Sequence, residues 1–139
     1  MEPGTSYAKI DFESEERFTR LARELGVTAF GLNALILAPG QRLRIHRHGL
    51  QEEVYIVITG TLSLAVEGEE RRLDVGDVAR VAPGVRRQLT NRDREQRCVV
   101  IAIGGAGEHE PRDAEAFTEW DQQPGRPPQE VPLPPDLVL

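Results

Sequence analysis

The middle of the chain is a succession of short apolar or alternating runs, each bounded by turn-forming residues. The runs cover residues 28–38, 53–58, 61–66, 78–81, 88–90 and 97–103. Between them lie pairs such as Pro39-Gly40, Thr59-Gly60 and Gly76-Asp77, at the spacing that is typical of a β-sandwich or β-barrel. Because the runs are short and turns interrupt them repeatedly, we predict an all-β fold.

The two ends of the chain depart from this pattern. Residues 14–25 have the period of a short amphipathic helix, with Ser14 as its cap and Gly26 at its end. The apolar face of this helix would hold Phe18, Leu21, Ala22 and Leu25. Seven of the ten prolines lie beyond residue 103, so that region cannot form a central strand. We expect an extended arm there, packed on a barrel, either its own or a partner's.

These patterns divide the chain into three parts of a single domain. Residues 1–26 form an N-terminal segment with the short helix, residues 27–106 a β-barrel, and residues 107–139 the Pro-rich C-terminal arm. A chain of 139 residues has room for one sizeable core. Within the arm, Phe117 and Trp120 stand three apart, which predicts a single helical turn beginning near Asp113 that anchors the arm.

Composition excludes several kinds of partner. The net charge of −6 opposes binding to a phosphate backbone, so no nucleic acid is expected. No apolar run approaches the roughly 18 residues of a membrane span, and the first residues lack the features of a signal peptide. We therefore expect a cytoplasmic protein that binds no membrane. The one cysteine, Cys98, opens an apolar run and is expected to be a buried thiol.

The strand that follows Glu52 is apolar on both faces. Because side chains alternate along a strand, Tyr55 and Val57 share one face with Glu53, whereas Val54, Ile56 and Ile58 share the other. A strand with one face in water would not have this pattern. We expect a terminal segment or a second subunit to cover the outer face, and we predict a homodimer.

A cluster of metal-ligand residue types lies at the start of this strand. Two of the three histidines form His46-Arg47-His48, and Glu52 and Glu53 follow shortly after. On an extended strand the two imidazoles project to the same side. Two histidines and one carboxylate can hold a divalent cation such as Fe, Mn, Ni, Co or Zn and leave coordination positions open. The same spacing is equally typical of surface or hydrogen-bonded histidines beside an acidic turn.

Residues 40–60 resemble the first motif of the cupin superfamily. The match is Gly40, five residues, His46-x-His48, four residues, Glu53, six residues and Gly60. The resemblance extends over residues 33–103 and implies a jelly-roll β-barrel of the small, single-domain, conserved-barrel type with its site inside. It implies that His46, His48 and Glu53 are the metal ligands and that Glu52 lies outside the site.

The second cupin motif is recognisable but altered. It is seen in Gly76-Asp77, Pro83-Gly84 and Asn91. Ala82 stands where the family has proline, and Arg87 stands where the family has its third metal-binding histidine. A guanidinium cannot ligate a metal, because it stays protonated and has no lone pair. At roughly 5 Å from a dication it would be repelled by about 7 kcal/mol at an effective dielectric constant of about 20.

Two arrangements resolve this conflict. In the first, the metal is bound, Arg87 binds an anionic substrate, most simply a carboxylate, and Tyr55 is a candidate proton donor, substrate contact or core tyrosine bonded to a backbone carbonyl. Resemblance to the small cupin enzymes then implies a dioxygenase, isomerase or decarboxylase. In the second, no metal binds, Arg87 pairs with Glu53, and the barrel binds a small molecule without catalysis.

Overall fold

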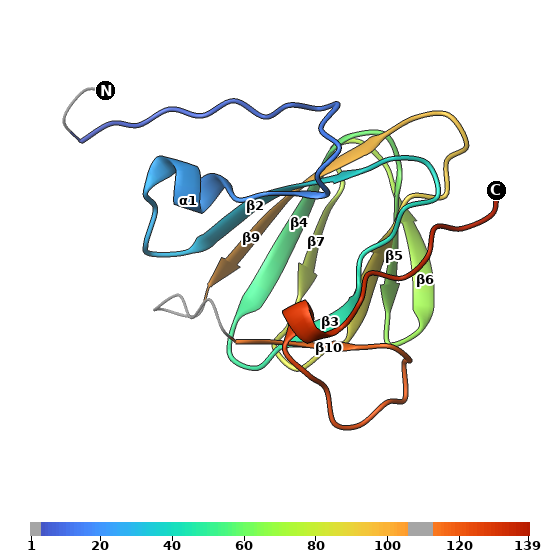
Figure 1. Ribbon diagram of the computed structural model, residues 1–139. Helices are drawn as coiled ribbons and strands as arrows, with labels where there is room; N and C mark the ends of the chain where they lie inside the picture. The colour runs from blue at the N-terminus through green and yellow to red at the C-terminus, as the bar shows by residue number, and fades with distance from the viewer. Residues whose placement is uncertain (1–3, 106–112) are drawn as a thin grey trace.

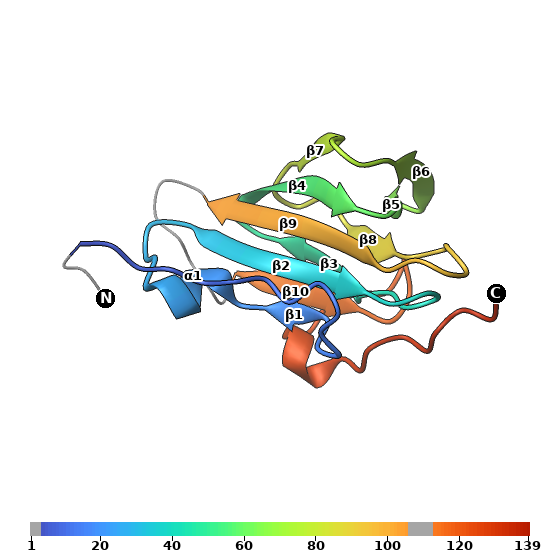
Figure 2. The same ribbon diagram turned by 90° about the horizontal axis from the view of Figure 1, so that it is seen from above.

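The computed structural model describes residues 4–105 and 113–139, and it is nearly all β, as the sequence predicts. Two five-stranded antiparallel sheets form the walls of one jelly-roll barrel (Figures 1 and 2). The first sheet has the order β1 (Phe18–Thr19), β2 (Gly31–Leu37), β9 (Cys98–Gly105), β4 (Glu52–Thr59) and β7 (Val78–Val81). The second has the order β10 (Ala114–Phe117), β3 (Ile45–His48), β8 (Arg87–Thr90), β5 (Leu62–Val66) and β6 (Glu69–Leu73).

The core lies between the two sheets, because each strand turns its alternate apolar residues inward. On β4, Tyr55 and Val57 are each 1% exposed and pair in register with Ala102 and Val100 of β9. Leu89 of β8 faces them from the second sheet as part of the same buried cluster. The all-β fold predicted from the alternating runs and the jelly-roll barrel implied by the cupin resemblance are therefore both observed. The polar strand β6 was not predicted, since its residues are mostly exposed and its sequence lacks the alternation.

The N-terminal helix is shorter than expected. Helix α1 spans Leu21–Leu25, and the preceding residues Phe18 and Thr19 form β1 instead of the first turns of a helix. Phe18 and Thr19 pair with Leu35 and Ala34 of β2, so pairing with a distant strand outweighs the local helical period. The predicted end of the helix is correct, because Gly26 adopts the left-handed conformation with φ of 78°.

The C-terminal segment contains a strand where a helical turn was expected. Residues 114–117 form β10, which pairs with β3, and Ala116 also exchanges backbone hydrogen bonds with Arg126. These sheet hydrogen bonds exclude the helical turn predicted from Phe117 and Trp120. Phe117 is still an anchor, since it is 2% exposed and its ring lies 3.6 Å from the Arg86 guanidinium.

The chain then runs back along its own barrel. It passes through the short 3-10 helix η1 (Pro128–Glu130), after which Val131 is 2% exposed. The Leu137 N–H donates to the Gly40 carbonyl, and Arg42 Nε donates to the Pro135 carbonyl. The predicted boundary between barrel and arm, at residue 106, lies outside the described residues. Within residues 4–105 and 113–139, no helix is long and apolar enough to cross a membrane.

The outer face of the first sheet is only partly covered. Where β1 and α1 contact β2, Ala34 and Ile36 are fully buried. Toward the other edge, Ile58 and Val78 are 36% and 61% exposed, and Ile56 is half-buried. The N-terminal segment therefore covers one side of this face and leaves apolar side chains of β4 and β7 exposed.

Candidate metal centre

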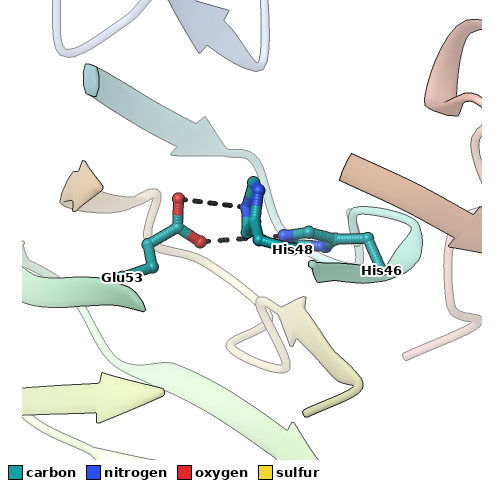
Figure 3. Close-up of side chains that lie close together, drawn as sticks. All are labelled: His46, His48 and Glu53. Atoms are coloured by element: carbon teal, nitrogen blue, oxygen red, sulfur yellow. Dashed lines mark ion pairs between the residues drawn. The ribbon is translucent and has the colours of Figure 1, made fainter. Parts of the chain in front are cut away.

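His46, His48 and Glu53 meet inside the barrel (Figure 3). The histidines come from β3 in one sheet and the carboxylate from β4 in the other. Glu53 Oε1 lies 3.7 Å from His46 Nε2, and Glu53 Oε2 lies 3.5 Å from His48 Nε2. The imidazole rings are perpendicular, with centroids 5.4 Å apart. The residues that the spacing selects as ligands thus converge, although they belong to different sheets.

Strand register explains this convergence. His46 and His48 alternate with Arg47, so both imidazoles face the interior. On the opposite wall, Glu53 is paired with Gly104 of β9. A Cβ on Gly104 would lie 3.2 Å from Gln51 Oε1, a tight contact, and 3.6 Å from Glu53 Oε2, an ordinary one, so this glycine lies directly beside the start of β4.

The donor set suits a divalent metal ion. The three ligand atoms lie within 4.8 Å of one another. Metal–ligand bonds of about 2.0–2.2 Å allow two donors to be up to about 4.2 Å apart, and both histidine–glutamate distances satisfy this limit. The Arg44 carbonyl lies 3.2 Å from His46 Nδ1 and can only accept, so Nδ1 carries a proton, and Nε2, which faces Glu53, is the nitrogen that would bind a metal.

His48 differs from His46 in its second nitrogen. Among the described residues, His48 Nδ1 is a buried polar atom without a hydrogen-bond partner. The two histidines and Glu53 are each less than a fifth exposed, with values of 18%, 16% and 12% for their side chains. A small ion or molecule can therefore reach the cluster, which is enclosed but not sealed.

Glu53 is held as a carboxylate. Burial alone would raise its pKa, but hydrogen bonding and positive charge from His46 and His48 hold the pKa of Glu53 well below its usual value. Its Oε1 also accepts a hydrogen bond from the Tyr55 hydroxyl. Burial, together with the negative charge of Glu53, raises the pKa of Tyr55 well above its usual value. Tyr55 therefore remains a neutral phenol that donates to Glu53, not to a backbone carbonyl.

Arg87 completes the cluster from β8. Its side chain is completely buried, and its Nη2 lies 3.4 Å from Glu53 Oε1. Nε donates to the Tyr55 hydroxyl at 3.2 Å, and Nη1 donates to the Val85 carbonyl at 2.6 Å. All five residues singled out in the sequence are thus brought together, and Arg87 contacts the glutamate that would ligate the metal. Its fork is occupied by protein groups in this conformation.

Glu52, the other carboxylate beside the histidine pair, does not join the cluster. Glu52 is outside the cluster, where its Oε2 lies 2.5 Å from Arg80 Nε, as the spacing implies. His109, the third histidine, was not assigned to the site from the sequence, and it lies outside the described residues. Sequence reasoning missed Asp113, which contacts the turn between the strand of the two histidines and the strand of Glu53. No local pattern around Asp113 indicates this contact, because it depends on how the C-terminal segment returns to the barrel.

The fold and the cluster define a class of protein: small antiparallel β-barrels with an internal site of two histidines and one glutamate. A family model described as the cupin domain matches residues 34–104, and the chain belongs to this family.

The chain is also similar to a protein of known sequence and to solved structures of cupin proteins. The tetracenomycin polyketide synthase protein TcmJ of Streptomyces glaucescens is 33% identical over 79 residues, which is 57% of this chain. The chain spans 53% of the length of TcmJ, about half. A cupin-superfamily structure from Silicibacter pomeroyi, described as a sugar phosphate isomerase, is 28% identical with a TM-score of 0.63 and covers 73% of this chain and 65% of its own. A cupin protein from Bacteroides fragilis shares the fold at 21% identity, with a TM-score of 0.64 and coverage of 88% and 97%.

Proposed function

We propose that the protein binds one divalent metal ion, Fe, Mn, Ni, Co or Zn, through His46, His48 and Glu53, and acts on a small anionic molecule. The observation that carries this proposal is the convergence of the three ligand atoms within 4.8 Å, from two sheets, in a partly enclosed site. Two imidazoles and one carboxylate leave coordination positions for a substrate. When bound, the metal would supply Lewis-acid or O2 chemistry, which suits a dioxygenase, an isomerase or a decarboxylase.

Residues of the chain itself would set the properties of this centre. Tyr55 and Arg87 both contact Oε1 of Glu53, which orients the carboxylate toward the histidines. Hydrogen bonding and positive charge from His46 and His48 keep the pKa of Glu53 well below its usual value, so it is ionised, as ligation requires. The Tyr55 hydroxyl already donates a hydrogen bond to Glu53, so it could protonate a substrate only after breaking that hydrogen bond. We therefore assign Tyr55 first to orienting Glu53.

The anionic substrate is inferred from Arg87. It is a fully buried cation beside the cluster, and a guanidinium fork matches a carboxylate or phosphate group. To bind such a group, Arg87 would have to exchange its contact with Glu53 Oε1 for one with the substrate. A carboxylate-bearing molecule is our first choice. The Silicibacter pomeroyi relative is described as a sugar phosphate isomerase, which supports an anionic substrate and makes isomerisation a reaction to test.

A second candidate function rests on the same contact. Because Arg87 lies 3.4 Å from Glu53 Oε1, the guanidinium can neutralise the carboxylate without a metal. The barrel would then bind a small molecule and catalyse nothing. The two functions differ in one property that can be measured directly, which is the metal content of the native protein.

Elemental analysis of protein purified without an affinity tag or chelator distinguishes them. We expect about one equivalent of Fe, Mn, Ni, Co or Zn per chain, as a single three-ligand site requires. The equivalent should be lost in His48→Ala and in Glu53→Gln. Protein that stays empty after dialysis against each of these ions would contradict the metal proposal and favour the metal-free binding function.

We also propose that the protein is a cytoplasmic homodimer in which a second copy covers the exposed part of the first sheet. The apolar side chains of Ile56, Ile58 and Val78 support this assignment, because a monomer would leave them in water. Sedimentation velocity should give the mass of two chains, and Ile56→Asp should give the mass of one. A monomeric wild type at micromolar concentration would contradict the dimer, and cell fractionation would test the compartment.

A further inference from the structure

We infer that Asp113 is a positioning residue for the metal centre: it holds the turn that joins the two ligand-bearing strands. This inference rests on the proposed metal-binding function. Asp113 lies beyond the region that the cupin family model matches, which ends at residue 104. The segment that begins at Asp113 would therefore be part of the working site of this protein.

Asp113 contacts every residue of the turn. Its Oδ2 accepts hydrogen bonds from the Leu50 N–H at 2.7 Å and from the Gln51 N–H at 2.9 Å. Its backbone carbonyl accepts a third from the Gly49 N–H at 3.1 Å. A Cβ on Gly49 would lie 3.0 Å from Asp113 Oδ1, so a glycine at this position leaves room for the carboxylate. One residue thus binds three consecutive backbone donors.

The turn is short and has a metal ligand near each end. His48 is the last residue of β3 and directly precedes Gly49, whereas Glu53 is the second residue of β4. Because β3 and β4 belong to different sheets, no ladder hydrogen bond joins them. The path of residues 49–51 therefore sets how far His48 lies from Glu53. Bonds from Asp113 restrict that path, so they act on the ligand geometry through the backbone.

Strand β10 supports the histidines from the same side. It starts at Ala114, next to Asp113, and pairs with β3 over four residues, including Ala114 with His48 and Ala116 with His46. On its other edge, β3 pairs with β8 through a single register pair, His46 with Arg87. The strand that carries both imidazoles is thus held mainly by β10, and Asp113 extends that hold across the turn.

A Co²⁺ titration of the full chain, followed by visible absorption, tests the inference. Asp113→Ala removes the acceptor for Leu50 and Gln51, and we expect it to weaken Co²⁺ affinity by about tenfold or more. In Asp113→Asn the amide oxygen can still accept both N–H groups, without the charge. We expect this conservative variant to recover most of the affinity.

Asp93 provides the matched control. Its Oδ1 accepts the N–H groups of Glu95 and Gln96, both at 2.8 Å, in the turn between β8 and β9 and outside the metal cluster. Asp93→Ala therefore removes the same kind of contact. We expect it to lower the melting temperature to a similar extent and to leave Co²⁺ affinity within about twofold of the wild type. Equal affinities for Asp113→Ala and Asp93→Ala would overturn the inference.

Failure of the metal proposal is recognised separately. If wild-type protein binds no Co²⁺, the proposed function fails, and NMR spectroscopy of the metal-free protein then decides the positioning claim. Asp113→Ala should speed amide hydrogen exchange at Leu50 and Gln51 and shift the imidazole resonances of His48, whereas Asp93→Ala should change neither. Unchanged exchange and unchanged His48 signals in Asp113→Ala would overturn the inference on their own.

Discussion

Arg87 Nη2 lies 3.4 Å from Glu53 Oε1, and the arginine side chain is completely buried. The two residues belong to strands of opposite sheets, β8 and β4, so the contact crosses the barrel. The same glutamate faces both histidines. Glu53 is therefore shared between the candidate metal centre and an internal ion pair. We expect both the stability of the fold and the metal affinity to depend on which cation balances its charge.

Removal of Arg87 should destabilise the fold strongly. In Arg87→Ala, Glu53 keeps its charge in a site where its side chain is 12% exposed, and no other cation contacts Oε1 among the described residues except His46 when protonated. Breaking a buried pair in this way costs about 3–5 kcal/mol. Urea unfolding of metal-free protein at neutral pH would measure the loss.

The neighbouring pair Arg80 and Glu52 is the control for that measurement. Its side chains are 63% and 51% exposed, so water already screens both charges. Arg80→Ala should lower the free energy of unfolding by less than about 1 kcal/mol. Equal losses of unfolding free energy in the two variants would show that Arg87 does not stabilise the charge of Glu53.

Replacing Arg87 with histidine should strengthen metal binding. Position 87 is in register with His46, so an imidazole there would enter the cluster from the adjacent strand. Arg87→His removes the guanidinium that repels a dication and adds a neutral donor. We expect Co²⁺ affinity to rise by about tenfold or more, which is the size of effect that residues next to metal ligands typically have. An unchanged affinity in a folded variant, judged by circular dichroism, would contradict the expected geometry.

Gly60, which directly follows β4, should tolerate no side chain. Gly60 has φ of 73°, and a Cβ there would lie 2.3 Å from the Arg97 carbonyl oxygen. Gly68 also has a positive φ, of 85°, but a Cβ would meet nothing within 4 Å. Gly68→Ala should cost about 1–2 kcal/mol from backbone strain alone. Gly60→Ala should cost clearly more in the same thermal melts, and similar costs would contradict the close approach.

The buried thiol should be inert in the folded protein. Cys98 is 0% exposed, and burial raises the pKa of its thiol to about 12. At pH 8 almost no thiolate forms, whereas an unfolded cysteine has a pKa of about 8.5. Iodoacetamide should therefore label the native protein far more slowly than the urea-unfolded protein. Equal labelling rates, followed by mass spectrometry, would show that Cys98 is accessible.

The sequence by itself predicted the all-β fold, and its resemblance to the first cupin motif singled out His46, His48 and Glu53 as candidate metal ligands. Alternation in the runs around Tyr55 and Leu89 is a property of neighbouring residues, and it persists in the folded protein because each strand needs one buried face. The spacing of His46, His48 and Glu53 is local in the same sense, since one turn joins their strands.

Only the tertiary structure decided which segments separated in the sequence pair with or contact one another. The period of residues 14–25 favours a helix, yet Phe18 and Thr19 pair with β2 because pairing satisfies backbone groups against a strand far along the chain. The same holds for residues 114–117, which pair with β3. The contact of Arg87 with Glu53 and that of Asp113 with the turn also join remote positions. Such contacts form because burial and strand pairing across the fold lower the free energy, and the local sequence pattern does not contain that information.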